Sequence, residues 1–311
     1  MCTLTRCSVR ALTLLLALMF AVGCSTTGQT TVVSLSAPQA ETVYALGARD
    51  QLLGVTDPCV FPEQLMEDRR SGKVRVVGGF VHIDTALVDS MKPDLVLTGT
   101  DFQKKIAEEF RKKGYKVLHY SPKRLEEVFQ SIEEIGDALG KGEEAKELTK
   151  GYRAELMEIR AKARTLPRVK VYMEINHLGP WAVGSESPVN DLIEAAGGEN
   201  IFADTAVGVF VTTHEEIIRR NPDVILSPIW INAKIGGYDG ITLLAEIYAR
   251  NGYEKTNAVQ HSRVLYYDSA LLKHEGPRQI LAVRKLAHLL HPEAFEDPVG
   301  TIPWELGKVV D

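Results

Sequence analysis

Rigid aromatic side chains are the residues of this chain best suited to binding chemistry. They follow short apolar segments that read as strands, at the points where loops begin. Flat rings gathered around one cleft favour a large, flat or partly apolar ligand. The alternative is that each ring covers the edge of its own hydrophobic core. The candidates are Phe61, Phe80, Trp181, Phe210, Trp230 and Tyr238, with His82 beside Phe80.

Three polar or thiol groups are further candidates, each with two interpretations. Arg278 opens a helix after Gly276-Pro277 and could meet a ligand carboxylate as a bidentate donor, or form a structural ion pair. Cys59 is a soft metal ligand or a small loop residue. Glu215 stands at a helix start, where the helix dipole favours an acid, and an exposed acid there could also dock arginines of a partner.

The motifs that would indicate catalysis are absent from the sequence. There is no glycine-rich phosphate loop ending in Lys-Ser or Lys-Thr, no G-x-G-x-x-G and no H-E-x-x-H. The segment 184–187 lacks the G-x-S-x-G spacing of a nucleophile elbow. We therefore predict a binding protein that is not an enzyme and has no cofactor or resident metal site. An extracytoplasmic enzyme on the same architecture is the distant alternative.

The first 23 residues have the composition of an export signal. Arg6 and Arg10 precede an apolar run over 11–22 that is too short for a confident transmembrane helix. The following Ala21-Val22-Gly23-Cys24 is similar to a bacterial lipobox. We expect a signal peptide over 1–23, a lipidated Cys24 and a polar tether over 24–30; a plain secretory signal is the alternative. The protein would then be extracytoplasmic, periplasmic or at the cell surface, and membrane-anchored only through its lipid.

The net charge excludes one class of partner, and the cysteine count excludes internal disulfide bonds. The whole chain has a formal charge of −5, and loss of two arginines with the signal makes it −7. A mildly acidic protein lacks the basic surface that nucleic-acid binding requires. Only Cys59 would remain besides Cys24, so no internal disulfide can form and the fold must be stabilised by its hydrophobic cores.

One long helix, predicted over 142–166, organises the chain. Apolar or small residues recur at steps of three and four along it, and Glu158 precedes Lys162 at the spacing of a surface ion pair. Gly142 precedes the helix and Pro167 ends it. About 24 residues at about 1.5 Å each give a rod of about 36 Å.

Short strands alternate with helices on both sides of this rod, which implies βαβ units and mainly parallel sheets. The fold class is therefore α/β, with two Rossmann-like lobes over 31–141 and 167–311 whose strand-end loops face one cleft. Strands are expected at 31–35, 52–55, 74–77, 94–98, 116–119, 169–174, 224–227 and 263–267. Helices are expected from 36 to 46 and at 102–113, 125–139, 189–196, 213–220, 241–250 and 280–290. Thr213-His-Glu-Glu216 reads as a capping box.

Ordered motifs over 32–295 resemble the substrate-binding lipoproteins of ABC importers for cobalamin and ferric chelates. They are Val33-Ser-Leu-Ser-Ala-Pro-Gln-Ala-Glu-Thr-Val-Tyr-Ala-Leu-Gly47, Leu53-Gly-Val-Thr56 with Phe61-Pro62, Val77-Gly-Gly-Phe80, Lys92-Pro-Asp-Leu-Val-Leu97, Leu192-Ile-Glu-Ala-Ala-Gly-Gly-Glu-Asn-Ile201, Asn221-Pro-Asp-Val224 and Gly276-Pro-Arg278.

The resemblance implies a monomeric clamshell with little hinge motion, which captures a metal chelate and delivers it to a permease with its ATPase. A corrinoid such as cobalamin is the leading single ligand, with a ferric siderophore or haem as the alternative. Family ligand aromatics map onto Phe80 and Trp181. Delivery uses one carboxylate on each lobe. Glu215 matches the carboxylate of the C-terminal lobe. Asp84 is the substitute for the carboxylate of the N-terminal lobe, and Asp89 and Glu63 are the next candidates.

Overall fold

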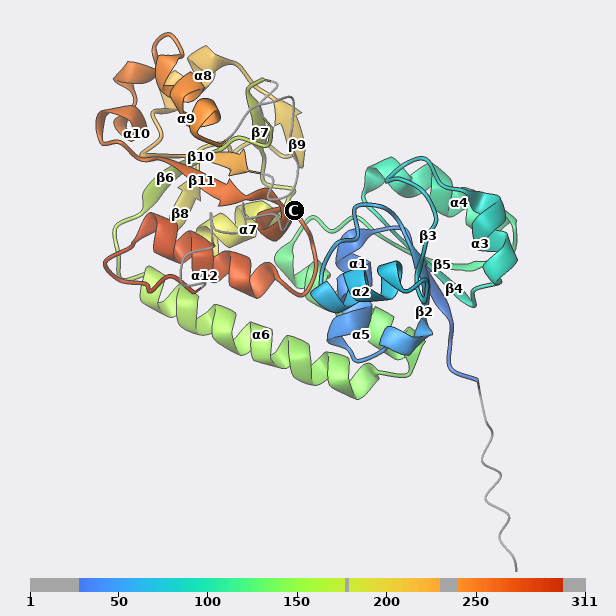
Figure 1. Cartoon of the computed structure of the whole chain (residues 1–311). Helices are drawn as coiled ribbons and strands as arrows, with labels where there is room; N and C mark the ends of the chain where they lie inside the picture. Colours follow the sequence, from blue (N-terminus) through green and yellow to red (C-terminus); the bar gives the residue numbers. More distant parts are fainter. Residues whose placement is uncertain (1–27, 177–178, 230–239, 299–311) are drawn as a thin grey trace, which may run out of the picture.

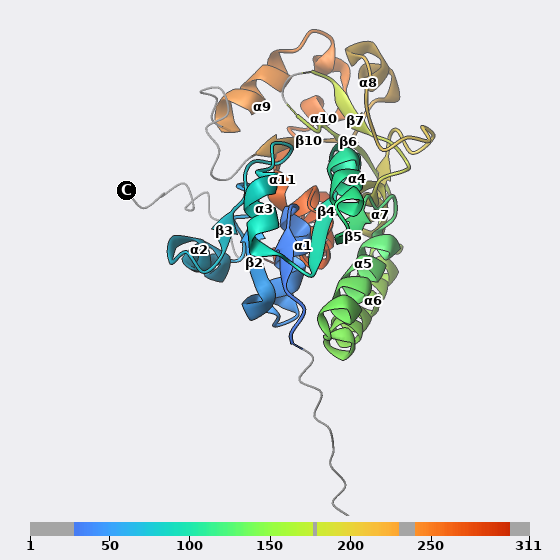
Figure 2. The ribbon, with the colours of Figure 1, turned by 90° about the vertical axis from the view of Figure 1, so that its right-hand side faces the viewer.

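The computed structural model describes residues 28–176, 179–229 and 240–298. Figure 1 shows two lobes side by side, with helix α6 (Gly142–Ala163) running beneath both. The turned view of Figure 2 shows α5 (Leu125–Leu139) lying alongside α6. Two α/β lobes with mainly parallel sheets, joined by one long helix, confirm the predicted fold class.

The N-terminal lobe contains a five-stranded, fully parallel sheet in the order β3-β2-β1-β4-β5. Its central strands β1 and β4 are buried throughout, as expected for parallel strands with helices on both faces. Its remaining elements are α1 (Ala37–Ala45), α2 (Glu63–Arg70), α3 (Thr85–Met91) and α4 (Lys104–Lys112), and 3-10 turns at Arg49–Gln51 and Asp101–Gln103. The strands are β1 (Val32–Ser34), β2 (Leu52–Val55), β3 (Arg75–Val76), β4 (Leu95–Gly99) and β5 (Lys116–Tyr120).

The C-terminal lobe contains a four-stranded parallel sheet in the order β11-β10-β6-β8, and a separate antiparallel pair, β7 with β9. Its strands are β6 (Val169–Met173), β7 (Trp181–Val183), β8 (Gly198–Asn200), β9 (Val209–Val211), β10 (Val224–Ile229) and β11 (Val264–Asp268). Its helices are α7 (Pro188–Ala195), α8 (His214–Arg220), α9 (Gly240–Ala249), α10 (Asn257–Gln260), α11 (Ser269–Leu272) and α12 (Gln279–Leu290), with a 3-10 turn at Tyr253–Lys255.

Helix α6 is packed along both lobes, because it contacts α5 of the first lobe and α7 and α12 of the second. Its buried residues include Ala145, Leu156 and Ile159, which belong to the apolar or small residues that recur along the helix at steps of three and four. These side chains belong to one hydrophobic core that continues from the first lobe into the second. The helix is therefore a support beneath both lobes as well as the connection between them.

Two details of α6 differ from the prediction. The helix ends at Ala163, three residues before Leu166, and the last amides donate over three residues in place of four. A proline disfavours helical geometry in the residue before it, so Leu166 cannot continue the helix into Pro167. Lys162 does not pair with Glu158 in the described structure. Its ammonium donates to the Ala294 carbonyl and lies 4.6 Å from the Phe295 ring.

Several short elements were missed by the sequence analysis. They are helices α2, α3, α10 and α11, and strands β7, β8 and β9, none longer than eight residues. The predicted capping box is half formed. The Thr213 hydroxyl accepts from the Glu216 amide at 3.1 Å, but the Glu216 carboxylate binds Arg219 and Arg220. Among the described residues, no helix is both long and apolar enough to cross a bilayer.

Candidate ligand-binding site

A cavity of about 650 Å³ lies between the lobes, at the ends of strands from both. The first lobe contributes the segments that follow β4 and β5, and the second contributes the segment after β6 and parts of the β7 and β9 region. Ligands of open parallel sheets bind at such carboxyl ends, and the volume lies within the range of small-molecule pockets. We call it the strand-end cavity. Its lining is Thr100, Asp101, Phe102, Ser121, Pro122, Lys123, Ile175, Asn176, Trp181, Glu186, Ser187, Pro188, Val207, Gly208, Val209 and Glu275.

Trp181 is the sequence-predicted aromatic residue that the structure places in this cavity. It opens β7 and is paired across the two-stranded sheet with Val211. Its carbonyl accepts from the Tyr172 hydroxyl at 3.1 Å, which ties this part of β7 to the buried strand β6. Val209, on the partner strand, lines the same cavity and is 48% exposed. An indole and a valine thus form an apolar wall fixed by backbone pairing.

Phe80 is not part of the cavity lining, but its ring contacts Phe102, a lining residue that the sequence analysis missed. The edge of its ring meets Phe102, with ring centroids 6.5 Å apart, and Phe102 is 79% exposed and lines the cavity. The Phe80 carbonyl accepts from the Gln103 amide at 2.6 Å, so the loop is anchored to the segment after β4. Phe102 carries the same signal as the other candidates, an aromatic residue directly after a strand, and could have been found from it.

His82 lies on the exposed side of the same loop. The loop turns back on itself at Gly78, where φ is +122° and a β-carbon would lie 2.3 Å from the His82 carbonyl oxygen. Only glycine fits this close approach. The Gly79 amide then donates to that carbonyl at 3.0 Å. The loop therefore has a defined shape that presents Phe80 and His82 at its tip.

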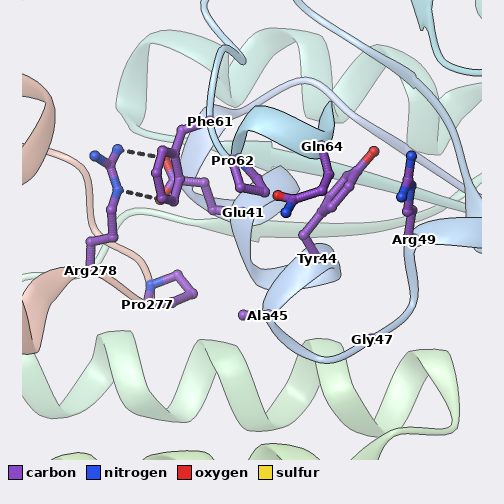
Figure 3. A pocket seen from close by; sticks show the side chains of 10 residues that line it. All are labelled: Glu41, Tyr44, Ala45, Gly47, Arg49, Phe61, Pro62, Gln64, Pro277 and Arg278. Carbon is purple, nitrogen blue, oxygen red and sulfur yellow. Dashed lines mark hydrogen bonds and ion pairs between the residues drawn. The ribbon is translucent and has the colours of Figure 1, made fainter. Parts of the chain in front are cut away.

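Phe61 and Arg278 line a different cavity, of about 460 Å³, between α1 and α2 of the first lobe and the start of α12 (Figure 3). We call it the ion-pair cavity. Arg278 donates to both carboxylate oxygens of Glu41, at 2.8 and 2.7 Å, and its guanidinium lies 4.2 Å from the Phe61 ring centroid. Of the two interpretations of Arg278, the structure shows the ion pair. The remaining lining is Tyr44, Ala45, Gly47, Arg49, Pro62, Gln64 and Pro277.

Phe210 contacts the core of its own lobe. Its ring lies edge-on to Phe202 at 5.4 Å between centroids and packs against a buried cluster of the second lobe that includes Tyr172 and Ile217. Its neighbours in β9, Val209 and Val211, face the opposite way and are exposed, as strand alternation requires. Trp230 and Tyr238 lie outside the described residues.

The charged residues that line the strand-end cavity are the exposed Asp101, the ion pair of Lys123 with Glu186, and the partly buried Glu275. The Lys123 ammonium of the first lobe lies 2.6 Å from the Glu186 carboxylate of the second, so this pair crosses the cavity lining. Burial raises the pKa of the Glu275 carboxyl above its usual range. The described residues include no cluster of three or more metal-binding side chains. The lining of the cavity combines aromatic and aliphatic side chains with a few charged groups.

Cys59 is buried in the first lobe, 1% exposed, with its sulfur 3.4 Å from the Thr56 hydroxyl. Burial raises the pKa of its thiol to about 11, so the thiolate that a soft metal requires is not formed at neutral pH. The structure thus places Cys59 as a core residue behind the loop that carries Phe61.

The candidate docking acids are exposed, one on each lobe. Asp84 is the N-cap of α3 and accepts from the Leu87 amide at 2.9 Å, leaving its other carboxylate oxygen uncommitted by any hydrogen bond within the described residues. Glu215 lies in the first turn of α8. Asp89 binds Lys113 and Tyr115, and the lysine holds its pKa below the usual range. Glu63 is exposed in the first turn of α2.

Two facing lobes on one long helix, with a ligand-sized cavity at their strand ends, define a class of binding protein. The family model described as periplasmic binding protein matches residues 32–271, so the chain belongs to that family. It is an ABC-type substrate-binding protein and not an enzyme.

Its relatives include an uncharacterized ABC transporter substrate-binding lipoprotein, YvrC, of Bacillus subtilis. This protein is 30% identical over 274 residues, which are 86% of this chain and 81% of YvrC. Among solved structures, the vitamin B12-binding protein BtuF of Vibrio cholerae has a TM-score of 0.69 at 20% identity, covering 85% of this chain and 97% of BtuF. The heme-binding protein RhuT of Roseiflexus sp. RS-1 has a TM-score of 0.71 at 23% identity, covering 86% and 100%.

Proposed function

We propose that this protein captures a metal chelate in the strand-end cavity and delivers it to an ABC permease. The observation that carries the proposal is the cavity itself: about 650 Å³ between the lobes, with Trp181 from one lobe and Phe102 from the other in its lining. Planar rings suit the flat organic shell of a chelate. With no cluster of metal-binding side chains among the described residues, the protein would recognise that shell and leave the metal to its own ligands.

A corrinoid is the first candidate ligand, with haem or a ferric siderophore as the alternative. Relatives and structural neighbours whose printed names include vitamin B12 and heme support this class. We assign the ligand contacts to Trp181, Phe80 and Phe102, with His82 at the loop tip. Trp230 and Tyr238 remain predictions from the sequence. Phe61, Phe210 and Arg278 make other contacts in this structure and are not included.

Calorimetric titration of the purified protein with cobalamin, haem and a panel of ferric siderophores tests the proposal. We expect saturable binding of one chelate class at one site per chain, and a visible spectrum if the ligand is retained during purification. Tyr248→Ala is a matched control for aromatic truncation, because Tyr248 is an exposed residue of α9 that does not line the cavity. Absence of binding to every chelate would overturn the proposal.

Delivery rests on Asp84 and Glu215, one exposed acid on each lobe, which would meet arginines of the permease through charge-assisted hydrogen bonds. Glu215→Lys should abolish chelate uptake by cells and leave the affinity of the purified protein unchanged. Glu199→Lys, at an exposed position of β8, is the control for charge reversal elsewhere on the lobe. Loss of affinity in Glu215→Lys would instead place that residue in ligand binding.

Export and anchoring complete the proposal. Residues 1–23 would be removed as a signal peptide, Cys24 would carry lipid, and residues 24–30 would be the tether to a monomeric two-lobed domain whose connecting helix lies between 31–141 and 167–311. Mass spectrometry of the mature N-terminus should find diacylglycerol on Cys24. Cys24→Ala should release the protein from the membrane fraction, and an unmodified Cys24 in the membrane fraction would contradict the anchor.

A further inference from the structure

Two buried carboxylates join the lobes through ion pairs with arginines of the opposite lobe. Glu41 of the first lobe, 4% exposed, binds Arg278 of the second through two hydrogen bonds of 2.8 and 2.7 Å. Asp191 of the second lobe, also 4% exposed, binds Arg124 of the first. Its Oδ2 atom accepts from Arg124 Nε at 3.0 Å and from the Leu125 amide at 2.8 Å, and its Oδ1 atom lies 2.9 Å from Arg124 Nη2.

The two ion pairs occupy equivalent positions in the two lobes. Arg124 is the N-cap residue of α5, the last helix of the first lobe, and Arg278 is the N-cap residue of α12, the last helix of the second. Their acids lie in α1 and α7, the first helix of each opposite lobe. Within each lobe, the last helix contacts both the first helix and α6. Each arginine therefore lies at the start of a helix that packs against α6, and its side chain binds an acid of the opposite lobe.

We propose that Arg124 and Arg278 are positioning residues that hold the lobes at a fixed separation when no ligand is bound, and so set the aperture of the strand-end cavity. Opening the lobes would pull each arginine away from its carboxylate. Breaking a buried ion pair that is held by two hydrogen bonds is unfavourable, because both charges lose their partner. Each lobe contributes one acid and one arginine. A hinge motion that opens either end of the interface would therefore stretch one of the two ion pairs.

The Asp191 pair lies directly beside the cavity whose width it would control. Lys123, the residue before Arg124, lines the strand-end cavity, as do Ser187 and Pro188 at the start of α7. The Glu41 pair lies at the ion-pair cavity, where the Phe61 ring covers the guanidinium. The two pairs would thus restrain the interface at the strand-end cavity and at the ion-pair cavity.

The two pairs differ in solvent exposure, which predicts their order of strength. The Arg278 side chain is 18% exposed and the Arg124 side chain 60% exposed. Water screens an exposed pair more strongly, so it contributes less. We expect loss of the Glu41 pair to open the lobes further than loss of the Asp191 pair, and loss of both to have the largest effect.

Pulsed electron–electron resonance of the ligand-free protein tests this directly. Spin labels are placed on Glu108→Cys in α4 and Glu254→Cys in the second lobe, both exposed, with the four native cysteines replaced by alanine. This doubly labelled protein, with both ion pairs intact, is the parent and should give one narrow distance peak. Glu41→Gln/Asp191→Asn should give a broader peak at longer distance. Glu126→Gln, which removes an acid that pairs with Arg153 between α5 and α6, should leave the peak unchanged.

An unchanged peak in a double variant that still unfolds cooperatively would overturn the proposal. If the double variant does not fold, Arg124→Gln remains informative, because its mostly exposed side chain can be replaced with little risk to folding. In that variant the peak should broaden, and a peak as narrow as the parent's would count against the proposal. Arg124→Lys should restore part of the narrow peak, since it keeps the charge and loses the two-point contact.

A second readout rests on the proposed function. For a chelate bound by the parent, stopped-flow measurements should show severalfold faster dissociation from Glu41→Gln/Asp191→Asn, because an aperture that is no longer fixed releases its ligand more easily. An unchanged dissociation rate together with an opened distance peak would show that aperture does not control retention. If the parent binds no chelate, the proposed function fails, while the distance measurement still decides whether the ion pairs hold the lobes.

Discussion

The two cavities between the lobes differ in what surrounds them. The strand-end cavity is lined by loops that follow parallel strands, with Trp181 and Phe102 facing it from opposite lobes. The ion-pair cavity is lined by helices α1 and α2 and the start of α12, and its charged groups are already paired: Arg49 with Asp68, and Arg278 with Glu41. Both cavities have aromatic residues in their linings, so an aromatic residue alone does not separate them. Its position at the carboxyl ends of parallel strands distinguishes the strand-end cavity.

Truncating one aromatic ring in each cavity should give the largest difference in chelate affinity between the two cavities. Trp181→Ala removes an indole from the strand-end cavity and should weaken chelate binding at least about tenfold, or about 1.4 kcal/mol. Phe61→Ala removes a ring from the ion-pair cavity, where it stacks on Arg278, and should change affinity by less than about twofold. Calorimetry on both variants measures the contrast.

Equal losses of affinity in the two variants would show that the ion-pair cavity takes part in binding. A loss in Phe61→Ala alone would move the ligand site to that cavity. Far-UV circular dichroism and the thermal unfolding midpoint of each variant confirm that the comparison is between folded proteins.

The strand-end cavity also contains an acid whose ionisation costs stability. Burial keeps the pKa of Glu275 above its unfolded value of about 4.3. The stability that this group contributes is present below that unfolded value and is lost as the pH rises through the folded pKa. Glu275→Gln is neutral throughout, so it should raise the free energy of unfolding at pH 7 and leave it nearly unchanged at pH 4. Each pKa unit corresponds to about 1.4 kcal/mol.

Urea unfolding at pH 4 and pH 7 measures this difference. Glu199→Gln, on the exposed side of β8, is the control and should show no dependence on pH beyond that of the parent. A Glu275→Gln variant that is less stable than the parent at pH 7 would mean that the carboxylate has a charged partner in solution.

Much of the fold follows from the sequence because its longer elements are strongly periodic. Helix α5 was predicted with its observed ends, Leu125 and Leu139, since fifteen residues give several repeats of the apolar spacing. The β7 and β9 pair could not be predicted in this way. Its strands have three residues each and begin 28 positions apart, and their apolar sequences, Trp-Ala-Val and Val-Phe-Val, show no alternation of polar and apolar residues.

The site was predictable only in part, for a related reason. Trp181 was found because a large ring after a strand is visible in the sequence. The pairing of Glu41 with Arg278 was not, because the residues are 237 positions apart and a buried acid on a helix looks like a surface acid until its partner is known. Contacts across the interface depend on how the lobes are set on α6, which local patterns do not encode.

The smallest expected effect concerns Cys59, two residues before Phe61 at the ion-pair cavity. Its thiol pKa of about 11 leaves only a trace of thiolate at pH 8, and burial keeps reagents away from its sulfur. Iodoacetamide should therefore leave Cys59 unmodified in the native protein and alkylate it fully in urea, as measured by peptide mass spectrometry. Saturating chelate should not change the native result, because the ligand would bind at the other cavity. Rapid alkylation of the native protein, suppressed by chelate, would instead couple the Phe61 loop to ligand binding and remove the distinction between the two cavities.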